Sequence, residues 1–265
     1  MNFSVLMSVY IKEKPSYLEE CLESLACQSL QPSEVILVED GEITRDLKNV
    51  ISRYLEIIPI KTIRLAENQG LAAALNEGLN HCSNELVARM DSDDVALPFR
   101  FERQVLFMLA HPEVTVSSAW IEERSENMRQ AIFLKKLPLA HKNILKFSKK
   151  RNPISHPVSI FRKSAVISVG GYPKIFPEDY ALWSLMLVKG YRFQNIPETL
   201  LYMRTGADFM SRRGLDFFKG EMTLLKYQKS IGFLSASEVL LNFMIRAVVR
   251  LSPIKLRTFF YKFAR

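Results

Sequence analysis

The residues with the clearest chemical potential are two aspartates, Asp91 and Asp93, in the stretch MDSDD at 90–94. They follow the apolar stretch 85–90, whose composition is typical of a buried strand. In an extended or turning backbone, such a pair can coordinate one cation directly or through water. Hard oxygen ligands suit Mg²⁺ or Mn²⁺. A divalent ion there would neutralise the charge on a departing diphosphate. Alternatively, these acids only cap the next helix or lie in solvent.

The elements around this pair predict an α/β fold. Buried strands are expected at 3–10, 34–39, 60–65 and 85–90, with helices between them at 16–29, 44–56 and 71–80. Ser16 and Glu19 are expected to form a capping box on the first helix. Such alternation implies right-handed crossovers and a mostly parallel, Rossmann-like sheet with helices on both faces. Ligands bind such sheets at the carboxyl ends of the strands, where Tyr10, Asp40 and Asp91 stand.

The later part of the chain is less regular. We expect a helix at 99–110, a strand at 113–119, a mixed region to about 205 and a mostly helical tail over 215–265. The segment 236–263 alternates apolar and basic residues, but its charges and a proline interrupt any apolar run long enough to span a membrane. We predict that this basic amphipathic tail lies on an anionic membrane surface. Packing on the catalytic domain or on a second subunit is the alternative.

Net charge and cysteine content limit the partners and the cellular compartment that this protein is expected to have. The net charge of +8 is compatible with nucleic acid, an anionic membrane or phosphorylated substrates as partners. No acidic residue follows Glu238, whereas six basic ones do: Arg246, Arg250, Lys255, Arg257, Lys262 and Arg265. The three cysteines form no CxxC pair, and the first residues lack the features of a signal peptide, so we expect a protein of the reducing cytoplasm. Basic residues do not interleave with aromatic ones as in nucleic-acid binders, so no nucleic-acid partner is expected.

Several motifs, taken in order, resemble the family 2 inverting glycosyltransferases. They are SVY at 8–10, Asp40-Gly41, Asn68-x-Gly70 followed by Ala73 and Asn76, MDSDD at 90–94, Gly170-Gly171-Tyr172 and PEDYALW at 177–183. The resemblance covers roughly residues 3–205 and is strongest to bacterial enzymes that extend lipid-linked O-antigen or exopolysaccharide repeat units. It implies an A-type glycosyltransferase fold, with a catalytic domain at 1–210 and a helical basic tail at 211–265. Within the domain, about 1–95 would hold the nucleotide sugar and about 96–210 the acceptor.

The resemblance also implies roles on the donor side. The donor would be a UDP-sugar, with the base's ring N–H bonded to Asp40. Ser8 and Tyr10 would line the nucleoside pocket, and Asn68 and Gly70 would also contact the donor. Asp91 would lie near the ribose or the metal, Asp93 would ligate Mn²⁺ or Mg²⁺, and Asp94 would be a third acid. Asp40 could instead serve an ordinary turn, and Tyr10 could simply cover the edge of the core.

On the acceptor side, inverting transfer needs a general base opposite the leaving diphosphate. Asp179 matches the family's base, and Glu178 would orient it or touch the acceptor. The same residues are favourable at a helix start, where the dipole would lower the pKa of Asp179. Trp183 is interpreted either as a platform for a sugar ring or as a core residue. His156 either flanks the acceptor site or is structural, and it is not expected to bind metal.

A histidine that many relatives carry after the Tyr-Arg strand is absent from 202–206. In its place, Arg204, Arg212 and Arg213 could hold the diphosphate of donor or acceptor, or form a solvated basic loop. We expect an inverting transferase that moves a hexose or N-acetylhexosamine onto a lipid-diphosphate-linked sugar, at the cytoplasmic face of the bacterial inner membrane. A nucleotidyltransferase, a basic nucleic-acid-binding module and a catalytically inactive relative are the alternatives.

Overall fold

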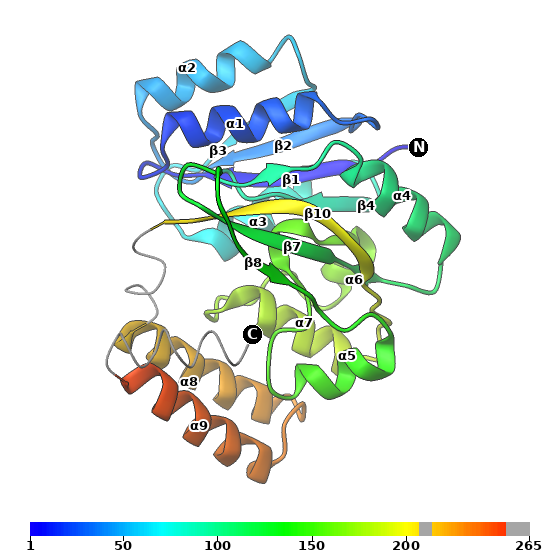
Figure 1. Cartoon of the computed structure of the whole chain (residues 1–265), viewed down its shortest axis with the longest axis vertical. Coiled ribbons are helices and arrows are strands. Elements are labelled where there is room, and N and C mark those ends of the chain that lie inside the picture. The colour runs from blue at the N-terminus through cyan, green and yellow to red at the C-terminus, as the bar shows by residue number, and fades with distance from the viewer. Residues whose placement is uncertain (207–213, 253–265) are drawn as a thin grey trace.

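The chain forms two sheets covered by helices in a computed structural model that describes residues 1–206 and 214–252 (Figure 1). The first half alternates strands with helices: β1 (Ser4–Val9), α1 (Pro15–Ala26), β2 (Glu34–Glu39), α2 (Arg45–Tyr54), β3 (Ile60–Arg64), α3 (Leu71–His81), β4 (Leu86–Arg89), β5 (Val95–Ala96) and α4 (Arg100–Ala110). The second half continues with β6 (Val116–Ser117), β7 (Ala119–Ser125), β8 (Ala131–Lys135), α5 (His141–Ser148), the 3₁₀ turn η1 (His156–Val158), β9 (Ile160–Arg162), α6 (Lys163–Ser168), α7 (Glu178–Val188), β10 (Ile196–Thr205), α8 (Leu215–Ser230) and α9 (Ala236–Leu251).

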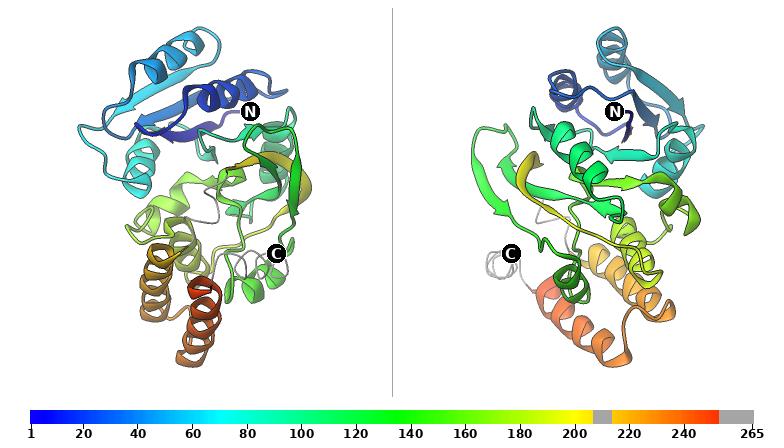
Figure 2. Two further views of the ribbon diagram at one scale, coloured as in Figure 1. Left: turned by 60° about the vertical axis from the view of Figure 1, so that its left-hand side comes forward. Right: turned by 90° about the vertical axis from the view of Figure 1, so that its right-hand side faces the viewer.

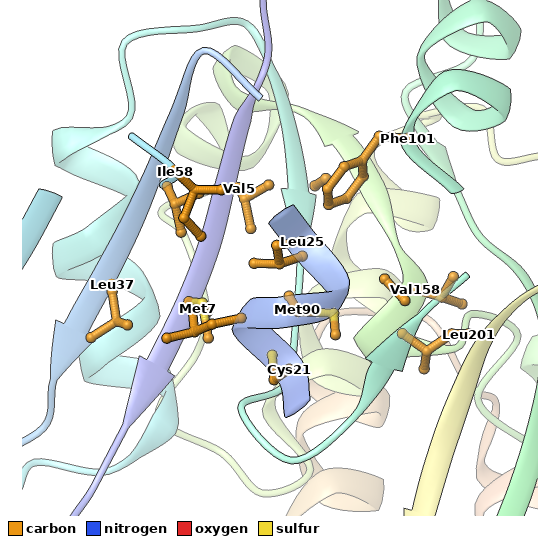
Figure 3. Close-up of a cluster of buried hydrophobic side chains, with 14 of the residues drawn as sticks. Val5, Met7, Cys21, Leu25, Leu37, Ile58, Met90, Phe101, Val158 and Leu201 are labelled. Atoms are coloured by element: carbon orange, nitrogen blue, oxygen red, sulfur yellow. The ribbon is translucent and has the colours of Figure 1, made fainter. Parts of the chain in front are cut away.

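The larger sheet has the order β3-β2-β1-β4-β9-β6. Its first four strands are parallel, and β9 runs antiparallel to both β4 and β6. Alternate residues of a strand point to opposite faces, so Val5 and Met7 pack in one core cluster and Leu6 packs in another. Figure 3 shows the first cluster, in which Cys21 and Leu25 of α1 cover the strands. The predicted α/β fold with a mostly parallel sheet is confirmed.

One predicted strand, 113–119, is wrong because the chain changes sheets within it. β6 belongs to the larger sheet, whereas β7 belongs to a second sheet of order β5-β10-β7-β8. The break falls at Ser118, which is fully buried. Its backbone N–H and its hydroxyl both donate to Asn195 Oδ1, at 3.1 and 2.8 Å. A distant side chain thus takes over the backbone donor that a continuous strand would have paired with its neighbour.

Two helix starts differ in their agreement with the predictions. α1 begins at Pro15, with Lys14 as its N-cap, so Ser16 lies inside the first turn and the predicted capping box is wrong. Proline is favourable at a first helical position because its missing N–H is one that the helix cannot pair. α7 begins at Glu178 directly after Pro177, as its acidic start predicts.

The C-terminal helices α8 and α9 pack on each other, and they contact the rest of the molecule at α7 and at the end of α5 (Figure 2). Leu225 of α8, together with Phe233 and Leu234 in the connection to α9, packs in the core cluster that contains Trp183. Among the described residues, no helix is both long and apolar enough to cross a membrane. The helical character predicted for 215–265 is therefore confirmed over the part that the structure describes.

Candidate active site

The predicted site residues gather at one edge of the larger sheet. β2, β1 and β4 are parallel neighbours, so their carboxyl ends lie side by side. Ser8 lies half-buried in β1, and Tyr10 follows that strand with 42% of its surface exposed. Asp40 follows β2, and Asp91 comes two residues after β4. The topology thus brings together side chains that lie up to 83 residues apart in the sequence, as parallel pairing predicts.

Three carboxylates cluster after β4. One oxygen from each of Asp91, Asp93 and Asp94 lies within 4.8 Å of the others. Burial, and then the negative charges of Asp91 and Glu13, raise the pKa of Asp93 to about 7. Burial, and then the charge of Asp93, raise the pKa of Asp94 well above its usual range. Asp94 Oδ1 accepts from the backbone N–H of Arg204 at 2.9 Å, while its buried Oδ2 has no partner among the described residues.

This donor set fits a hard divalent cation. All three groups offer carboxylate oxygens, the ligand type that Mg²⁺ and Mn²⁺ prefer. Burial and the neighbouring negative charges disfavour the ionised forms of Asp93 and Asp94, and a bound dication would relieve both effects. The unpaired Oδ2 of Asp94 is a further sign that the protein does not by itself satisfy this cluster.

Two neighbours of the cluster were missed by sequence reasoning. Arg89, 1% exposed, forms a buried ion pair with Asp91, and its Nε and Nη1 find no hydrogen-bond partner within 1–206 and 214–252. Glu13, in the loop after β1, accepts a 2.5 Å hydrogen bond from the hydroxyl of Ser92. The available signal for Arg89 was a charge inside an otherwise apolar strand, because such a charge needs a partner when buried.

Asp40 organises the predicted turn at 68–70. Its Oδ1 accepts from the backbone N–H of Gln69 at 2.7 Å, and its Oδ2 accepts from the N–H of Gly70 and from Asn68 Nδ2, both at 3.0 Å. The next residue, Gly41, has φ of 80°, and an added Cβ would lie 2.6 Å from the backbone N of Asn68. The ordinary-turn interpretation of Asp40 therefore has direct support. A carboxylate has about four acceptor positions, so Oδ1 keeps one for a ligand.

The predicted base begins α7. Asp179 Oδ1 accepts from the N–H of Tyr180 at 2.8 Å, and Oδ2 accepts from Asn152 Nδ2 at 2.6 Å. The N–H of Tyr180 at the helix start does lower the pKa of Asp179, as expected, and Asn152 also lowers it, but burial outweighs both hydrogen bonds and the pKa is raised overall. Burial, and then the charge of Asp179, raise the pKa of Glu178 to about 7. The charge of Asp91 contributes to that shift, so the two acidic groups lie within electrostatic reach of each other.

Trp183 and His156 belong to the core. Trp183 is 0% exposed, so it is not a platform for a sugar ring. His156 is also buried, and its Nε2 shares a 3.1 Å hydrogen bond with the hydroxyl of Tyr172. Burial, and then the charge of Arg89, lower the pKa of His156 well below its usual range. The histidine is therefore neutral near pH 7 and has a structural role in the core.

The Gly170-Gly171-Tyr172 motif connects α3 to the segment before α7. Asn76 Oδ1 accepts from the N–H of Tyr172 at 2.7 Å, and Asn76 Nδ2 donates to the carbonyl of Tyr172 at 2.9 Å. A Cβ on Gly171 would lie 2.4 Å from Asn76 Oδ1, so this approach requires glycine. Two motifs, 95 residues apart, therefore form one structural contact.

The guanidinium of Arg204 is occupied by protein partners, so its predicted role as a phosphate ligand is not supported. Nε donates to the carbonyl of Asp93 at 2.9 Å, Nη1 to the carbonyl of Glu126, and Nη2 to the carboxylate of Glu20 at 2.5 Å. The side chain thus fastens the end of β10 to the acidic loop, to α1 and to the turn after β7. Arg212 and Arg213 lie outside the described residues.

Comparisons with known proteins agree on one class. A family model described as Glycosyl transferase family 2 matches residues 4–170. The amylovoran biosynthesis glycosyltransferase AmsE of Erwinia amylovora is 42% identical over 98% of this chain and 98% of its own. The UDP-Gal:alpha-D-GlcNAc-diphosphoundecaprenol beta-1,3-galactosyltransferase of Escherichia coli is 38% identical over 98% of this chain and 95% of its own.

Solved structures show the same fold. S. aureus TarS in complex with UDP-GlcNAc superposes with a TM-score of 0.66 and 21% identity, over 93% of this chain and 72% of that one. The mannosyltransferase PcManGT from Pyrobaculum calidifontis, in complex with GDP-Man and Mn²⁺, superposes with a TM-score of 0.65 and 16% identity, over 99% and 79%. At these identities, the likeness concerns the fold.

Proposed function

We propose, since this chain belongs to glycosyl transferase family 2, that it moves a hexose or N-acetylhexosamine from a UDP-sugar to a lipid-diphosphate-linked sugar, with inversion, in the synthesis of a bacterial surface polysaccharide. As a family 2 glycosyltransferase, the chain is neither a nucleotidyltransferase nor a nucleic-acid-binding module. The observation that carries the proposal is the pairing of the carboxylate cluster after β4 with a second acidic pair at the start of α7.

The donor would bind at the carboxyl edge of β1, β2 and β4. Asp40 Oδ1 retains the capacity to accept from the base's ring N–H, while Tyr10 offers an exposed ring beside it. Ser8, Asn68 and Gly70 would complete the nucleotide pocket. Because Asp40 also orders the turn that contains Asn68 and Gly70, one carboxylate would shape the pocket and contact the ligand.

Asp91 and Asp93, with Asp94 behind them, would hold Mn²⁺ or Mg²⁺. When bound, the ion supplies positive charge that stabilises the leaving diphosphate. Arg89 offsets one negative charge of the cluster through its ion pair with Asp91. The hydrogen bond from Ser92 to Glu13 fixes the loop between the two metal-binding aspartates.

Asp179 would act as the base. It would take the proton of the acceptor hydroxyl as that oxygen attacks the anomeric carbon from the side opposite the diphosphate. Its two hydrogen bonds, from Tyr180 N–H and Asn152 Nδ2, orient the carboxylate and favour its ionised form. Glu178, with a pKa of about 7, would contact the acceptor or hold Asp179 in place.

The acceptor would be a sugar carried on a lipid diphosphate, as the printed name of the Escherichia coli relative says of that enzyme. Arg212 and Arg213 would pair with the acceptor's diphosphate, since guanidinium groups bind phosphate oxygens bidentately. A lipid-anchored acceptor would place the enzyme at the cytoplasmic face of the inner membrane.

The test is a panel of radiolabelled UDP-sugars offered with a short-chain lipid-diphosphate-GlcNAc or -GalNAc acceptor, with and without Mn²⁺. We expect transfer from one UDP-sugar, dependence on the divalent ion, and a product of inverted anomeric configuration. Asp179→Asn should bind the donor and not transfer it. A variant that kept more than about a tenth of the rate would exclude Asp179 as base, since a general base contributes roughly 10²–10⁴-fold.

A further inference from the structure

The helix α9 buries polar side chains against the protein and leaves most of its apolar side chains exposed, except that Val239 packs against a core cluster and Phe243 lies against Phe218 of α8. Its buried residues are Asn242 and Arg246. The outer face of α9, by contrast, consists of apolar side chains that are 49–63% exposed: Leu240, Leu241, Met244, Ile245, Val248 and Leu251. Figures 1 and 2 show α9 at the bottom of the molecule, on the outside of α8. This is the reverse of the usual surface helix, whose apolar stripe faces the core.

The polar side of α9 faces α8 and the end of α5. Arg250 donates to both carboxylate oxygens of Glu221 on α8, at 2.8 and 3.2 Å, and Arg246 lies 3.9 Å from the same carboxylate. Asn242 Nδ2 donates to the carbonyl of Lys149 at 2.9 Å. These contacts fix the orientation of the helix. Arg246 and Arg250, two of the six basic residues after Glu238, therefore contact Glu221 inside the protein and do not add to the charge of the outer surface.

A face of this kind needs an apolar partner. Soluble monomers rarely expose large contiguous apolar patches, and those that they do expose are often interaction sites. Leu240, Met244 and Val248 form one stripe at helical spacing, and Leu241 and Ile245 form a second beside it. At about 1.5 Å per residue, the 16-residue helix is shorter than the roughly 30 Å of a bilayer core. It is suited to lying in a membrane interface rather than crossing it.

The charges around the face indicate an anionic partner. The contact between Asn242 and Lys149 places α9 beside the end of α5, where Lys146 and Lys150 are exposed. The sequence after Ser252 adds four basic residues and no acidic one. In a two-fold dimer through this face, the lysines of α5 would approach their own copies and repel. An anionic bilayer offers both the apolar interior and the complementary charge.

We propose that the outer face of α9 inserts into the boundary between headgroups and acyl chains of an anionic bilayer, with the lysines of α5 on the headgroups. This proposal rests on the proposed function, because a lipid-linked acceptor must be reached at a membrane. The chain from Lys149 to Asn152 connects the docking surface to the hydrogen-bond partner of Asp179. The acceptor half of the site therefore lies on the membrane side.

The experiment uses the full chain and vesicles of phosphatidylcholine with or without phosphatidylglycerol. Leu240→Glu with Met244→Glu should weaken binding to the anionic vesicles by at least about tenfold, because two side chains lose their apolar burial. The matched control is Leu55→Glu with Ile57→Glu. These residues are similarly exposed, at 46% and 59%, beside α2 at the opposite end of the molecule. The control should bind like the wild type.

A second variant, Lys146→Glu with Lys150→Glu, should bind anionic and neutral vesicles almost equally. Unchanged vesicle binding by the α9 variant would overturn the proposal. So would a wild-type dimer that the α9 variant makes monomeric, or a lower melting temperature in that variant, since these would assign the face to a second copy or to the chain itself. Vesicle binding and transfer to a water-soluble acceptor are measured separately. Failure of docking is thereby distinguished from failure of the proposed activity.

Discussion

The hydrogen bond from Asn152 to the proposed base can be tested through the pH dependence of the reaction. Asn152 Nδ2 donates to Asp179 Oδ2 at 2.6 Å. A hydrogen bond to a charged group contributes about 1.5–3 kcal/mol, and about 1.4 kcal/mol corresponds to one pKa unit. Asn152→Ala should therefore raise the pKa of Asp179, which burial already raises, by a further ~1–2 units.

The sign of the effect follows from the role of the group. A base must be ionised, so a higher pKa keeps Asp179 protonated and inactive to a higher pH. The acid limb of kcat/KM should move upward by the same ~1–2 units, with a loss of roughly 10–100-fold along that limb. Activity at high pH should be largely retained, because the carboxylate ionises there without the help of Asn152.

The assay is kcat/KM for transfer measured across the pH range, with Asn84→Ala as control. Asn84 is also half-buried and donates from Nδ2 to Ser4 Oγ at 3.1 Å, but it lies at the amino-terminal end of β1. Asn84→Ala should leave the acid limb of the kcat/KM profile at the wild-type pH. A uniform loss at every pH in Asn152→Ala would make Asn152 purely structural, and an unchanged profile would refute Asp179 as the titrating base.

Three further predictions concern the acidic cluster, the turn and the contacts of Arg204. Asp93 has a folded pKa of about 7, above its unfolded value, so the folded state holds a proton that the unfolded state releases, and stability should fall as the pH rises from about 4 to 7. Mn²⁺ should accordingly raise the melting temperature more at pH 8 than at pH 5, and Asp93→Asn should remove this effect together with activity; an equal rise at both pH values would contradict a metal site here. Asp40→Ala should weaken UDP binding by about tenfold in calorimetry, because it removes a ligand contact and releases the N–H of Gly70; unchanged affinity would limit Asp40 to the turn. Arg204→Met should lower the free energy of unfolding in urea by about 1–3 kcal/mol, since the contact with Glu20 and two carbonyl partners are lost; equal stability would show that these contacts are dispensable.

The sequence by itself determined the sheet and the edge at which chemistry occurs. Alternating apolar runs and helical segments are local patterns, and the handedness of the crossovers then leaves few arrangements of four parallel strands. The residues that follow those strands, Tyr10, Asp40 and Asp91, had to meet at one edge. The acidic start of α7 was equally local, because proline and acidic side chains are favourable at a helix N-terminus.

Burial and long-range partners were decided only by the tertiary structure. The pKa of Asp179 rises because the surrounding fold removes water, an effect that opposes the local influence of the helix start. Its partner Asn152 lies 27 residues earlier. The burial of Arg89, which makes its ion pair with Asp91 important, likewise depends on the packing around β4. The direction in which α9 faces was also open: its sequence is amphipathic either way, and Glu221 on α8 settles it by holding the arginines inward. Such interactions depend on which segments the fold places together, and that information is not contained in the spacing along one segment.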